Sequence, residues 1–446
     1  MAEFGLCEQA AEALAKESIH DKMIGCLFGS ALGDAIGLYT EFLSGEMSAA
    51  AYPSRRFVLH PASEATLFRL DAHRNPQRPG EWTDDTDHAM LILLSCLHVD
   101  CRTFDTQDFA ARLLIWVRFG LRALDTLPLG LGRTVGSIVR TKNFLDDPEG
   151  RARNHWKNSS YHIAPNGSLM RTHPLGLLCL RKSLEETFET AAAYSVITHV
   201  DPRCIISCAV GTGLIRGLIR QEVRTEADLD SVIEKALSWW KGYRLRQLED
   251  PERTDEPDLD LKEFSKHAKV TDLAVLELGD AYKMGYVYKT FGSGIHLLRM
   301  AMRKSAELGN TLTASSTMFE PLITDLIMWG GDADTNACFA GALVGSYLGY
   351  KSLPPHWRDG LRHGQWLMHK AEGLCQLLGV SDGPYTGSED KDTAPDGGRG
   401  IPTDSQMEEM AMKLQADMVR REQERTKLED EGQKQKKGYS QWFRRK

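Results

Sequence analysis

Residues 109–124 read FAARLLIWVRFGLRAL, in which apolar side chains return every three or four positions. That spacing places them on one face of an α-helix, which is then buried against other elements. The same spacing recurs in LILLSCLHV (91–99), TFETAAAYSVIT (187–198) and CAVGTGLIRGLIR (208–220). Alternating polar and apolar runs of strand length are scarce, and no pair of runs carries a convincing hairpin signal. The sequence therefore predicts an all-α fold over residues 20–350.

The composition is that of an ordinary globular protein. The 446 residues are 42% hydrophobic and 26% charged, and the formal charge of -8 gives no reason to expect a stable nucleic-acid partner. Nine cysteines without a CxxC pair argue against a zinc–thiolate cage and against an extracellular disulfide framework. The N-terminus does not resemble a secretory signal, and no stretch approaches the roughly 20 apolar residues of a transmembrane segment. A cytoplasmic or nuclear location is expected.

The chain divides into a long helical part and charged ends. Residues 1–21 are alanine-rich and predict a lead-in helix before one helical domain over 22–379. Within that domain, residues 241–272 are charged and carry two prolines, which is typical of a surface insertion. Residues 380–405 predict a disordered linker, and 406–446 a charged tail that is helical or disordered. The basic, aromatic end of the tail is typical of a solvated segment, and an unknown partner for it stays open.

Two acidic runs, EWTDDTD (81–87) and GGDADTN (330–336), come directly before apolar helical stretches. A single Asp–Thr pair at such a place is normally a helix cap. Each run, however, carries more negative charge than one helix end neutralises, and close carboxylates raise each other's pKa unless a cation lies among them. Neither run contains histidine or cysteine within it, so the oxygen donors favour Mg²⁺ or Mn²⁺ over zinc.

Small and apolar residues recur at helical spacing after the second acidic run: Ala337, Ala340, Gly341, Val344, Gly345 and Leu348. Small side chains let a neighbouring helix approach closely, and a rigid bundle can hold metal ligands on facing helices. The pattern predicts a tightly packed core helix beside the acidic run.

Six stretches, in order along the chain, resemble the ADP-ribosylglycohydrolase family. They are GCLFGSALGDAIG (25–37) followed by Glu41, EWTDDTDHAML (81–91), NGSLMRTHPLG (166–176), THVDPRC (198–204), MGYVYKTFGSG (284–294) and GGDADTNACFAGALVGSYLGY (330–350). The resemblance leaves out 241–272 and everything after about residue 380. It implies an orthogonal multi-helix bundle with a central metal cleft that binds ADP-ribose.

The resemblance implies a binuclear site for two Mg²⁺ ions, with Mn²⁺ as an alternative. The implied ligands are Glu41, Thr83, Asp84, Asp85, Asp332, Asp334 and Thr335. The acidic runs alone point to the same aspartates, whereas Glu41 follows from the resemblance only. In this family the metal pair engages the hydroxyls of the distal ribose and positions water near its anomeric carbon. Glu41 is the candidate catalytic residue, unless it serves as a mobile ligand that yields to substrate.

The resemblance also implies substrate-binding residues, namely Gly130, Gly132, Asn166, Gly167, Ser168 and His199. Glycines let backbone N–H groups approach a pyrophosphate. Arg171 is expected to support the loop at 166–168. Asp201 and Arg203 are compatible equally with ligand contact and with an ion pair that shapes the loop at His199, and they are left out of the candidate site. Three aromatic residues are candidates either to stack on adenine or to pack in the core, namely Tyr286, Tyr288 and Phe291.

Together these features predict a Mg²⁺-dependent hydrolase that cleaves the glycosidic bond at the distal ribose of an ADP-ribosylated protein, nucleic acid or small molecule and releases ADP-ribose. Two alternatives stay open: a catalytically silent protein that binds ADP-ribose or a nucleotide, and a hydrolase of a related ADP-ribose metabolite. The sequence does not distinguish arginine, serine, a nucleic-acid end, a polymer or a metabolite as the acceptor, and it does not give the oligomeric state.

Overall fold

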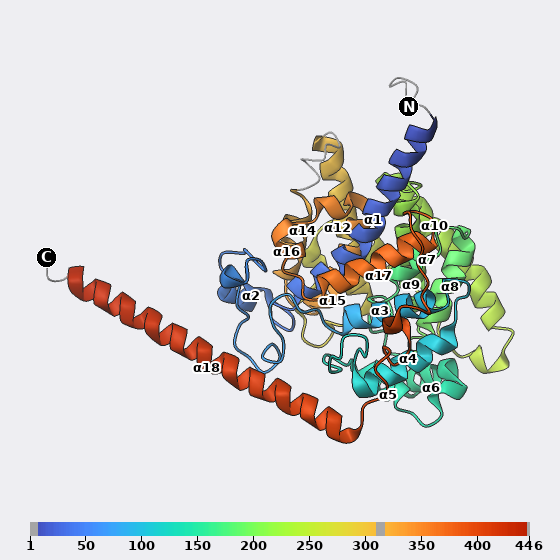
Figure 1. Cartoon of the computed structure of the whole chain (residues 1–446). Helices are drawn as coiled ribbons and strands as arrows, with labels where there is room; N and C mark the ends of the chain where they lie inside the picture. Colours follow the sequence, from blue (N-terminus) through green and yellow to red (C-terminus); the bar gives the residue numbers. More distant parts are fainter. Residues whose placement is uncertain (1–7, 309–316, 444–446) are drawn as a thin grey trace. The chain divides into compact units, whose positions relative to one another are not determined.

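The computed structural model describes the backbone of residues 8–308 and 317–443, and the side chains of 12–308, 317–424 and 426. Within these residues the chain is helical, without a strand longer than an isolated bridge (Figure 1). The α-helices are α1 (Glu8–Gly37), α2 (Gly45–Ala51), α3 (Asp84–His98), α4 (Thr106–Phe119), α5 (Arg133–Val139), α6 (Pro148–Asn158), α7 (His173–Leu178), α8 (Leu184–Ser195), α9 (Pro202–Ile219), α10 (Glu226–Gln247), α11 (Leu261–Ala268), α12 (Val287–Leu308), α14 (Phe319–Ile327), α15 (Ala333–Leu348), α16 (Pro355–Arg358), α17 (Gly364–Leu377) and α18 (Asp404–Phe443). The predicted all-α fold is confirmed.

The four stretches with helical spacing lie for the most part in α3, α4, α8 and α9. Their ends follow from capping. The carboxylate of Asp105 accepts hydrogen bonds from the first turn of α4, and the helix ends at Gly120, which has a φ of 72°. The side chain of Ser183 accepts from the backbone N–H of Glu186, which completes a capping box at the start of α8.

The helix α9 is long and apolar enough to cross a membrane by length and composition alone. In this structure 94% of its length is buried within the protein. Such burial is what the central helix of a helical core requires, because an all-round apolar helix needs neighbours on every side.

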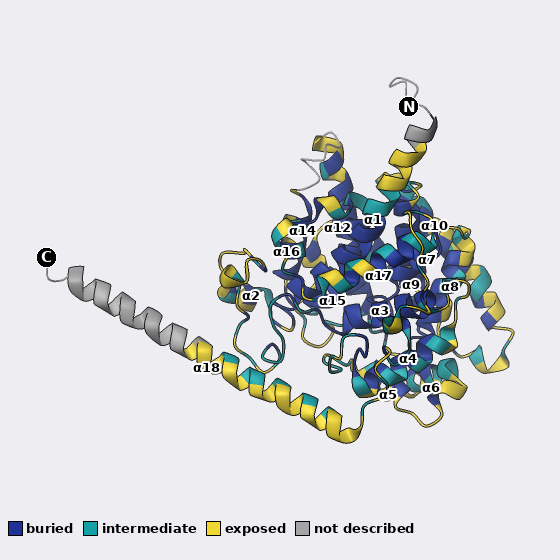
Figure 2. Ribbon diagram, in the orientation of Figure 1, coloured by how far each residue is buried: buried dark blue, intermediate teal, exposed yellow. Residues whose placement is uncertain are grey.

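The core around the acidic runs is built on the contact between α1 and α15. Figure 2 shows both helices buried, apart from the exposed N-terminal end of α1. Four glycines of α1 face the backbone of α15 at intervals of one turn, namely Gly25, Gly29, Gly33 and Gly37. A Cβ atom on Gly33 would lie 2.0 Å from the carbonyl oxygen of Ala337, and one on Gly37 would lie 2.3 Å from the Cα of Asp334. The small residues of α15 thus mark a close helix contact, as predicted, and the contact brings the end of α1 to the first turn of α15.

The predicted segments 1–21 and 380–405 differ from the structure in where they begin and end. The lead-in helix expected over 1–21 is continuous with the domain, because α1 runs unbroken to Gly37, and residues 1–7 lie outside the described residues. Residues 380–399 belong to the larger compact unit, Met1–Leu67 with Pro79–Arg399. The fully buried ammonium group of Lys370 lies 2.5 Å from a carboxylate oxygen of Asp390. This packing differs from the disordered linker that the composition predicts, because a buried cation requires a partner.

The smaller unit comprises Phe68–Arg78 and Gly400–Lys446. Its backbone is helical from Asp404 to Phe443, and an ion pair of 2.6 Å joins Arg78 to Asp417 within the unit. Three aromatic side chains at the end of the tail lie outside the described side chains: Tyr439, Trp442 and Phe443.

The charged segment 241–272 is anchored more firmly than a plain surface insertion. Its buried side chains include Phe264, and the buried carboxylate of Glu256 pairs with Arg253 at 3.0 Å and with Arg244 at 3.6 Å. Charged residues here form a partly buried network that helical periodicity does not detect. The segment also ends in α11, which reaches the pocket described below.

Candidate metal centre and ligand pocket

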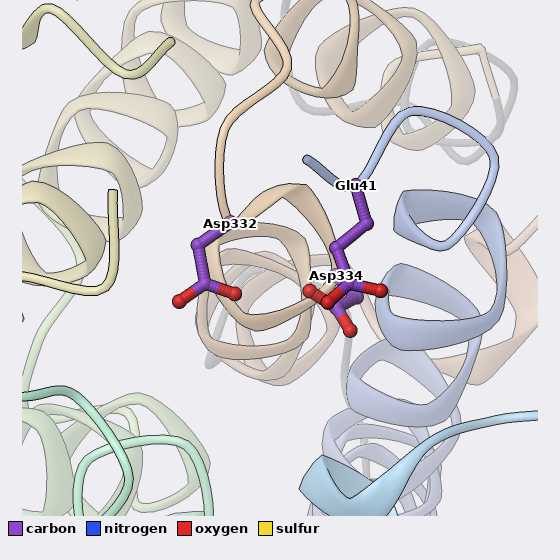
Figure 3. Close-up of side chains that lie close together, drawn as sticks. All are labelled: Glu41, Asp332 and Asp334. Atoms are coloured by element: carbon purple, nitrogen blue, oxygen red, sulfur yellow. The ribbon is translucent and has the colours of Figure 1, made fainter. Parts of the chain in front are cut away.

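Carboxylates from two distant parts of the chain meet where α1 ends and α15 begins. Carboxylate oxygens of Glu41, Asp332 and Asp334 lie within 4.8 Å of one another. Figure 3 shows Glu41 entering from the loop after α1, while Asp332 and Asp334 enter from the start of α15. Three carboxylates at this separation can share one cation.

The N-terminus of α3 brings the other acidic run to the same place. The backbone N–H of Asp85 donates to the hydroxyl of Thr83 at 3.4 Å, and this hydroxyl lies 3.3 Å from Oδ2 of Asp85 and 3.4 Å from Oδ2 of Asp334. Asp84 and Thr335 line the pocket that contains the carboxylates. The structure therefore gathers all seven residues of the implied ligand set, and their ligation of a metal stays a prediction.

Asp34, in the helical run before Glu41, has a supporting place that the sequence did not reveal. Its fully buried carboxylate accepts hydrogen bonds from the backbone N–H groups of Thr83 and Thr86 at 2.9 and 3.0 Å, and from the Thr86 hydroxyl at 2.6 Å. Burial raises the pKa of Asp34 to about 7, although the hydrogen bonds from Thr83 and Thr86 act to lower it. Asp34 thus fixes the start of α3 onto α1 and holds the acidic run 81–87 in position.

The electrostatics of the centre favour a bound cation. Burial raises the pKa values of Asp84, Asp85 and Asp334 well above the ordinary range, and repulsion from neighbouring carboxylates raises them further. In addition, Oδ1 of Asp85 is buried without a hydrogen-bond partner among the described residues. Such an oxygen requires a proton or a cation. Because the donors are carboxylates and hydroxyls only, the residues fit a hard divalent ion such as Mg²⁺ or Mn²⁺.

A pocket of about 1030 Å³ contains this centre. Five of the six predicted substrate-binding residues line it: Gly130, Gly132, Asn166, Gly167 and His199. Ser168 does not, and here the prediction requires correction. Its side chain is fully buried, and its Oγ accepts a 3.0 Å hydrogen bond from Ser195 of α8. The loop turns Ser168 toward the helices behind the pocket, so it supports the loop and does not face a ligand.

Asn166 connects the pocket wall to the acidic centre. Its Nδ2 donates to Oδ2 of Asp332 and to the hydroxyl of Thr290, each at 2.9 Å. These bonds hold the Asp332 carboxylate in one orientation, which is the task of groups that surround metal ligands. Asn166 therefore orients a predicted ligand in addition to lining the pocket.

His199 and Arg171 stabilise the loop beside Asn166. The buried guanidinium of Arg171 donates to the carbonyl oxygen of Gly167 at 3.2 Å and to the hydroxyl of Thr198 at 2.7 Å, as expected for a loop support. The same hydroxyl lies 2.7 Å from Nδ1 of His199. Burial, with the nearby Arg171 charge, lowers the pKa of His199 well below its usual value, which favours the neutral ring. Its Nε2 is buried without a partner among the described residues, and His199 lines the pocket.

The aromatic candidates divide into pocket and core. Tyr288 and Phe291 are fully buried and pack near Phe264, so these two rings do not stack on a ligand. Tyr286 lines the pocket. Arg203 forms an ion pair with Asp201 at 2.7 Å, and it also lines the pocket.

The residues of the pocket that the sequence reasoning did not single out include Phe42 and Glu263. Phe42 directly follows Glu41 and is half exposed, and Glu263 belongs to the charged segment 241–272. A charged residue within a charged segment carries no signal of its own, so only the fold could reveal Glu263.

Gly130 and Gly132 provide a matched test of the pocket wall. At Gly130 the φ is 84°, and a Cβ would lie 2.3 Å from Oδ1 of Asp84, whereas a Cβ on Gly132 meets nothing within 4 Å. Gly130→Ala is therefore expected to displace Asp84 and to lower hydrolysis of an ADP-ribosylated substrate by about tenfold or more. Gly132→Ala displaces no protein atom, so its effect on the rate is expected to be severalfold smaller. Equal rates for the two variants, measured as ADP-ribose released per minute, would contradict the assigned contact.

Comparisons with known proteins identify the family of this chain. The sequence model of the ADP-ribosylglycohydrolase family matches residues 15–384. The chain is 25% identical over 368 residues to the ADP-ribosylarginine hydrolase Tri1 of Serratia proteamaculans, and the match covers 81% of each chain. It is 24% identical over 368 residues to the ADP-ribosylhydrolase ARH3 of Danio rerio, which covers 78% of this chain and 88% of that one. It is 22% identical over 368 residues to the ADP-ribosyl-[dinitrogen reductase] glycohydrolase of Rhodospirillum rubrum, which covers 81% of this chain and 98% of that one.

A solved structure described as an ADP-ribosylglycohydrolase-related protein complex shares the fold, with a TM-score of 0.50 at 21% identity over 81% of this chain and 99% of that chain. The family match spans most of the sequence and includes every residue of the acidic centre. The chain therefore belongs to the ADP-ribosylglycohydrolase family, a family of enzymes.

Proposed function

We propose that this enzyme is a Mg²⁺-dependent hydrolase, with Mn²⁺ as an alternative ion, that cleaves the glycosidic bond at the distal ribose of an ADP-ribosyl group and releases ADP-ribose. The observation that carries this proposal is the oxygen-only centre, in which Glu41, Asp332 and Asp334 lie within 4.8 Å inside a pocket of about 1030 Å³. The named relatives, which are hydrolases of ADP-ribosylated substrates, support the reaction class.

Two divalent ions held by the seven oxygen-donating residues would neutralise the buried carboxylates and polarise the ribose hydroxyls and a water molecule. The protein contributes the orientation of the donors. Asn166 holds Asp332 at 2.9 Å, and the Thr83 hydroxyl contacts both Asp85 and Asp334. Because these side chains are fixed before substrate binds, the distal ribose meets a preorganised site.

We assign to Glu41 the carboxylate chemistry at the reacting carbon. It is the member of the acidic centre that comes from a loop and not from the start of a helix. Cleavage at an anomeric carbon passes through an oxocarbenium-like state, which a carboxylate stabilises, and a carboxylate also takes a proton from the attacking water. The remaining pocket residues bind the rest of the ADP-ribosyl group. Gly130, Gly132 and Gly167 leave room for the pyrophosphate at the backbone.

Removal of divalent ions is expected to abolish the activity. Treatment with a chelator should lower ADP-ribose release by at least about a hundredfold, because Lewis-acid stabilisation contributes several kcal/mol. Addition of Mg²⁺ should restore the rate, and a parallel sample with Mn²⁺ tests the ion preference. Release is measured by chromatography on a panel of arginine-, serine- and phosphate-linked ADP-ribose substrates.

Each alternative has its own result in this experiment. Undiminished release in chelator would refute the metal requirement. Tight ADP-ribose binding by calorimetry, without turnover on any linkage, would identify a silent binding protein. A product other than ADP-ribose would identify a hydrolase of a related metabolite.

A further inference from the structure

Glu263 is a pocket carboxylate that belongs neither to the acidic centre nor to the six family-like stretches. It stands on α11, within the charged segment 241–272, and lines the same pocket as Asp332. Its Oε1 accepts a 2.6 Å hydrogen bond from the hydroxyl of Tyr286. In the described part of the chain, no Lys or Arg forms an ion pair with this carboxylate, and its second oxygen has no donor. A ligand in the pocket can therefore donate to it.

Glu263 lines the same pocket as the acidic centre and contacts Tyr286, which belongs to the wall between Asn166 and α12. The backbone N–H of Asn166 donates to the carbonyl oxygen of Gly285 at 3.0 Å, which joins the two segments of this wall. Gly285 lies against the centre, since a Cβ there would be 3.2 Å from Oδ2 of Asp332. The next residue, Tyr286, reaches Glu263 with its hydroxyl. Glu263 is thus connected to the carboxylates of the centre through Gly285 and the Tyr286 side chain.

This inference rests on the proposed function, which places the distal ribose at the acidic centre. The other end of an ADP-ribosyl group is its adenine base, and the Tyr286 ring offers a face on which a base can stack. The guanidinium of Arg203 lies 5.5 Å from the centroid of that ring. Because Arg203 is itself paired with Asp201 at 2.7 Å, its charge does not decide between a neutral base and a cationic acceptor, and the experiment below separates the two.

Adenine carries an exocyclic 6-amino donor, while hypoxanthine and guanine present a 6-oxo acceptor at the same position. A carboxylate accepts from the amine and repels the oxo group. We propose that Glu263, held by Tyr286, selects adenine by accepting a hydrogen bond from its 6-amino group, so that the charged segment 241–272 sets the base specificity of the pocket.

The test compares ADP-ribose with its hypoxanthine analogue, inosine diphosphoribose, by calorimetry on the full chain with Mg²⁺. The native enzyme is expected to prefer ADP-ribose by about tenfold or more, because a site built for a hydrogen bond leaves a buried group unpaired with the wrong ligand. Glu263→Gln should reduce this preference to about twofold, since an amide both accepts and donates. Tyr286→Phe keeps the ring and should weaken the preference severalfold. Glu249→Gln, at an exposed glutamate of the same segment, is the matched control and should match the native enzyme.

Equal affinity of the native enzyme for both ligands, or an undiminished preference in folded Glu263→Gln, would overturn the inference. If Glu263→Gln does not fold, as judged by circular dichroism, an undiminished preference in Tyr286→Phe overturns it instead. A variant that changes KM for substrates while ADP-ribose affinity stays native would place Glu263 at the acceptor and also overturn it. Failure of the proposed function would give a different result, because the native enzyme would then release no ADP-ribose from any substrate.

Discussion

Asp334→Asn is expected to lower ADP-ribose release by about a thousandfold, the largest effect of a single substitution on activity. Carboxylate oxygens of Asp334, Glu41 and Asp332 lie within 4.8 Å of one another. Oδ2 of Asp334 also lies 3.4 Å from the Thr83 hydroxyl. An amide removes one negative charge from the centre and so weakens ion binding, and loss of a stabilisation of several kcal/mol corresponds to this factor. Initial rates at saturating Mg²⁺ measure the change.

The same variant has a second readout that separates loss of chemistry from loss of folding. Without divalent ions, Asp334→Asn should melt no lower than the native protein, because it removes a buried carboxylate whose neighbours repel it. With Mg²⁺, the native protein should gain thermal stability through ion binding, and the variant should gain less. Asp255→Asn, at an exposed position, is the control. A large Mg²⁺-dependent rise in Tm that persists in Asp334→Asn would argue against ligation by this residue.

Gly33→Ala is expected to lower the free energy of unfolding by about 3 kcal/mol or more, or to prevent folding. The added methyl group would lie 2.0 Å from the carbonyl oxygen and 2.5 Å from the carbonyl carbon of Ala337. These are backbone atoms, so α1 and α15 must move apart, and overpacking of a close contact costs about 1–3 kcal/mol or more. Urea denaturation followed by circular dichroism measures the loss.

Gly242→Ala is the matched control for this substitution. Gly242 lies within α10, and the atom nearest to an added Cβ is the end of the Arg246 side chain at 3.9 Å. Here alanine should stabilise the protein by about 0.5–1 kcal/mol, because it loses less backbone entropy than glycine in a helix. A Gly33→Ala variant as stable as Gly242→Ala would mean that the two core helices are not as close as described.

The sequence predicted the helices and the acidic residues because both leave a local pattern. Residues 109–124 show helical spacing, and α4 occupies most of that stretch. Asp332 and Asp334 stand out because two carboxylates at a helix start exceed what a cap needs. Glu41 has no such pattern, and only the resemblance to the family singled it out.

The remaining features depend on contacts between segments far apart along the chain. Ser168 was expected to face a ligand, but its orientation depends on Ser195 of α8. The order of residues 380–399 depends on Lys370, a buried cation whose partner Asp390 lies in a segment of disordered composition. The role of Asp34 as an acceptor for the start of α3 becomes apparent only when α3 is placed beside α1. None of these relations is periodic, so no local pattern could show them.

Thr83 and Asp334 are 251 positions apart in sequence, yet their side chains touch. Nearly the whole of the larger unit must therefore be synthesised before the two acidic runs can come into contact. Closing so long a loop costs conformational entropy that tertiary packing must first offset. A divalent ion that needs ligands from both runs would therefore bind only after they have met, and folding must reach that stage without it.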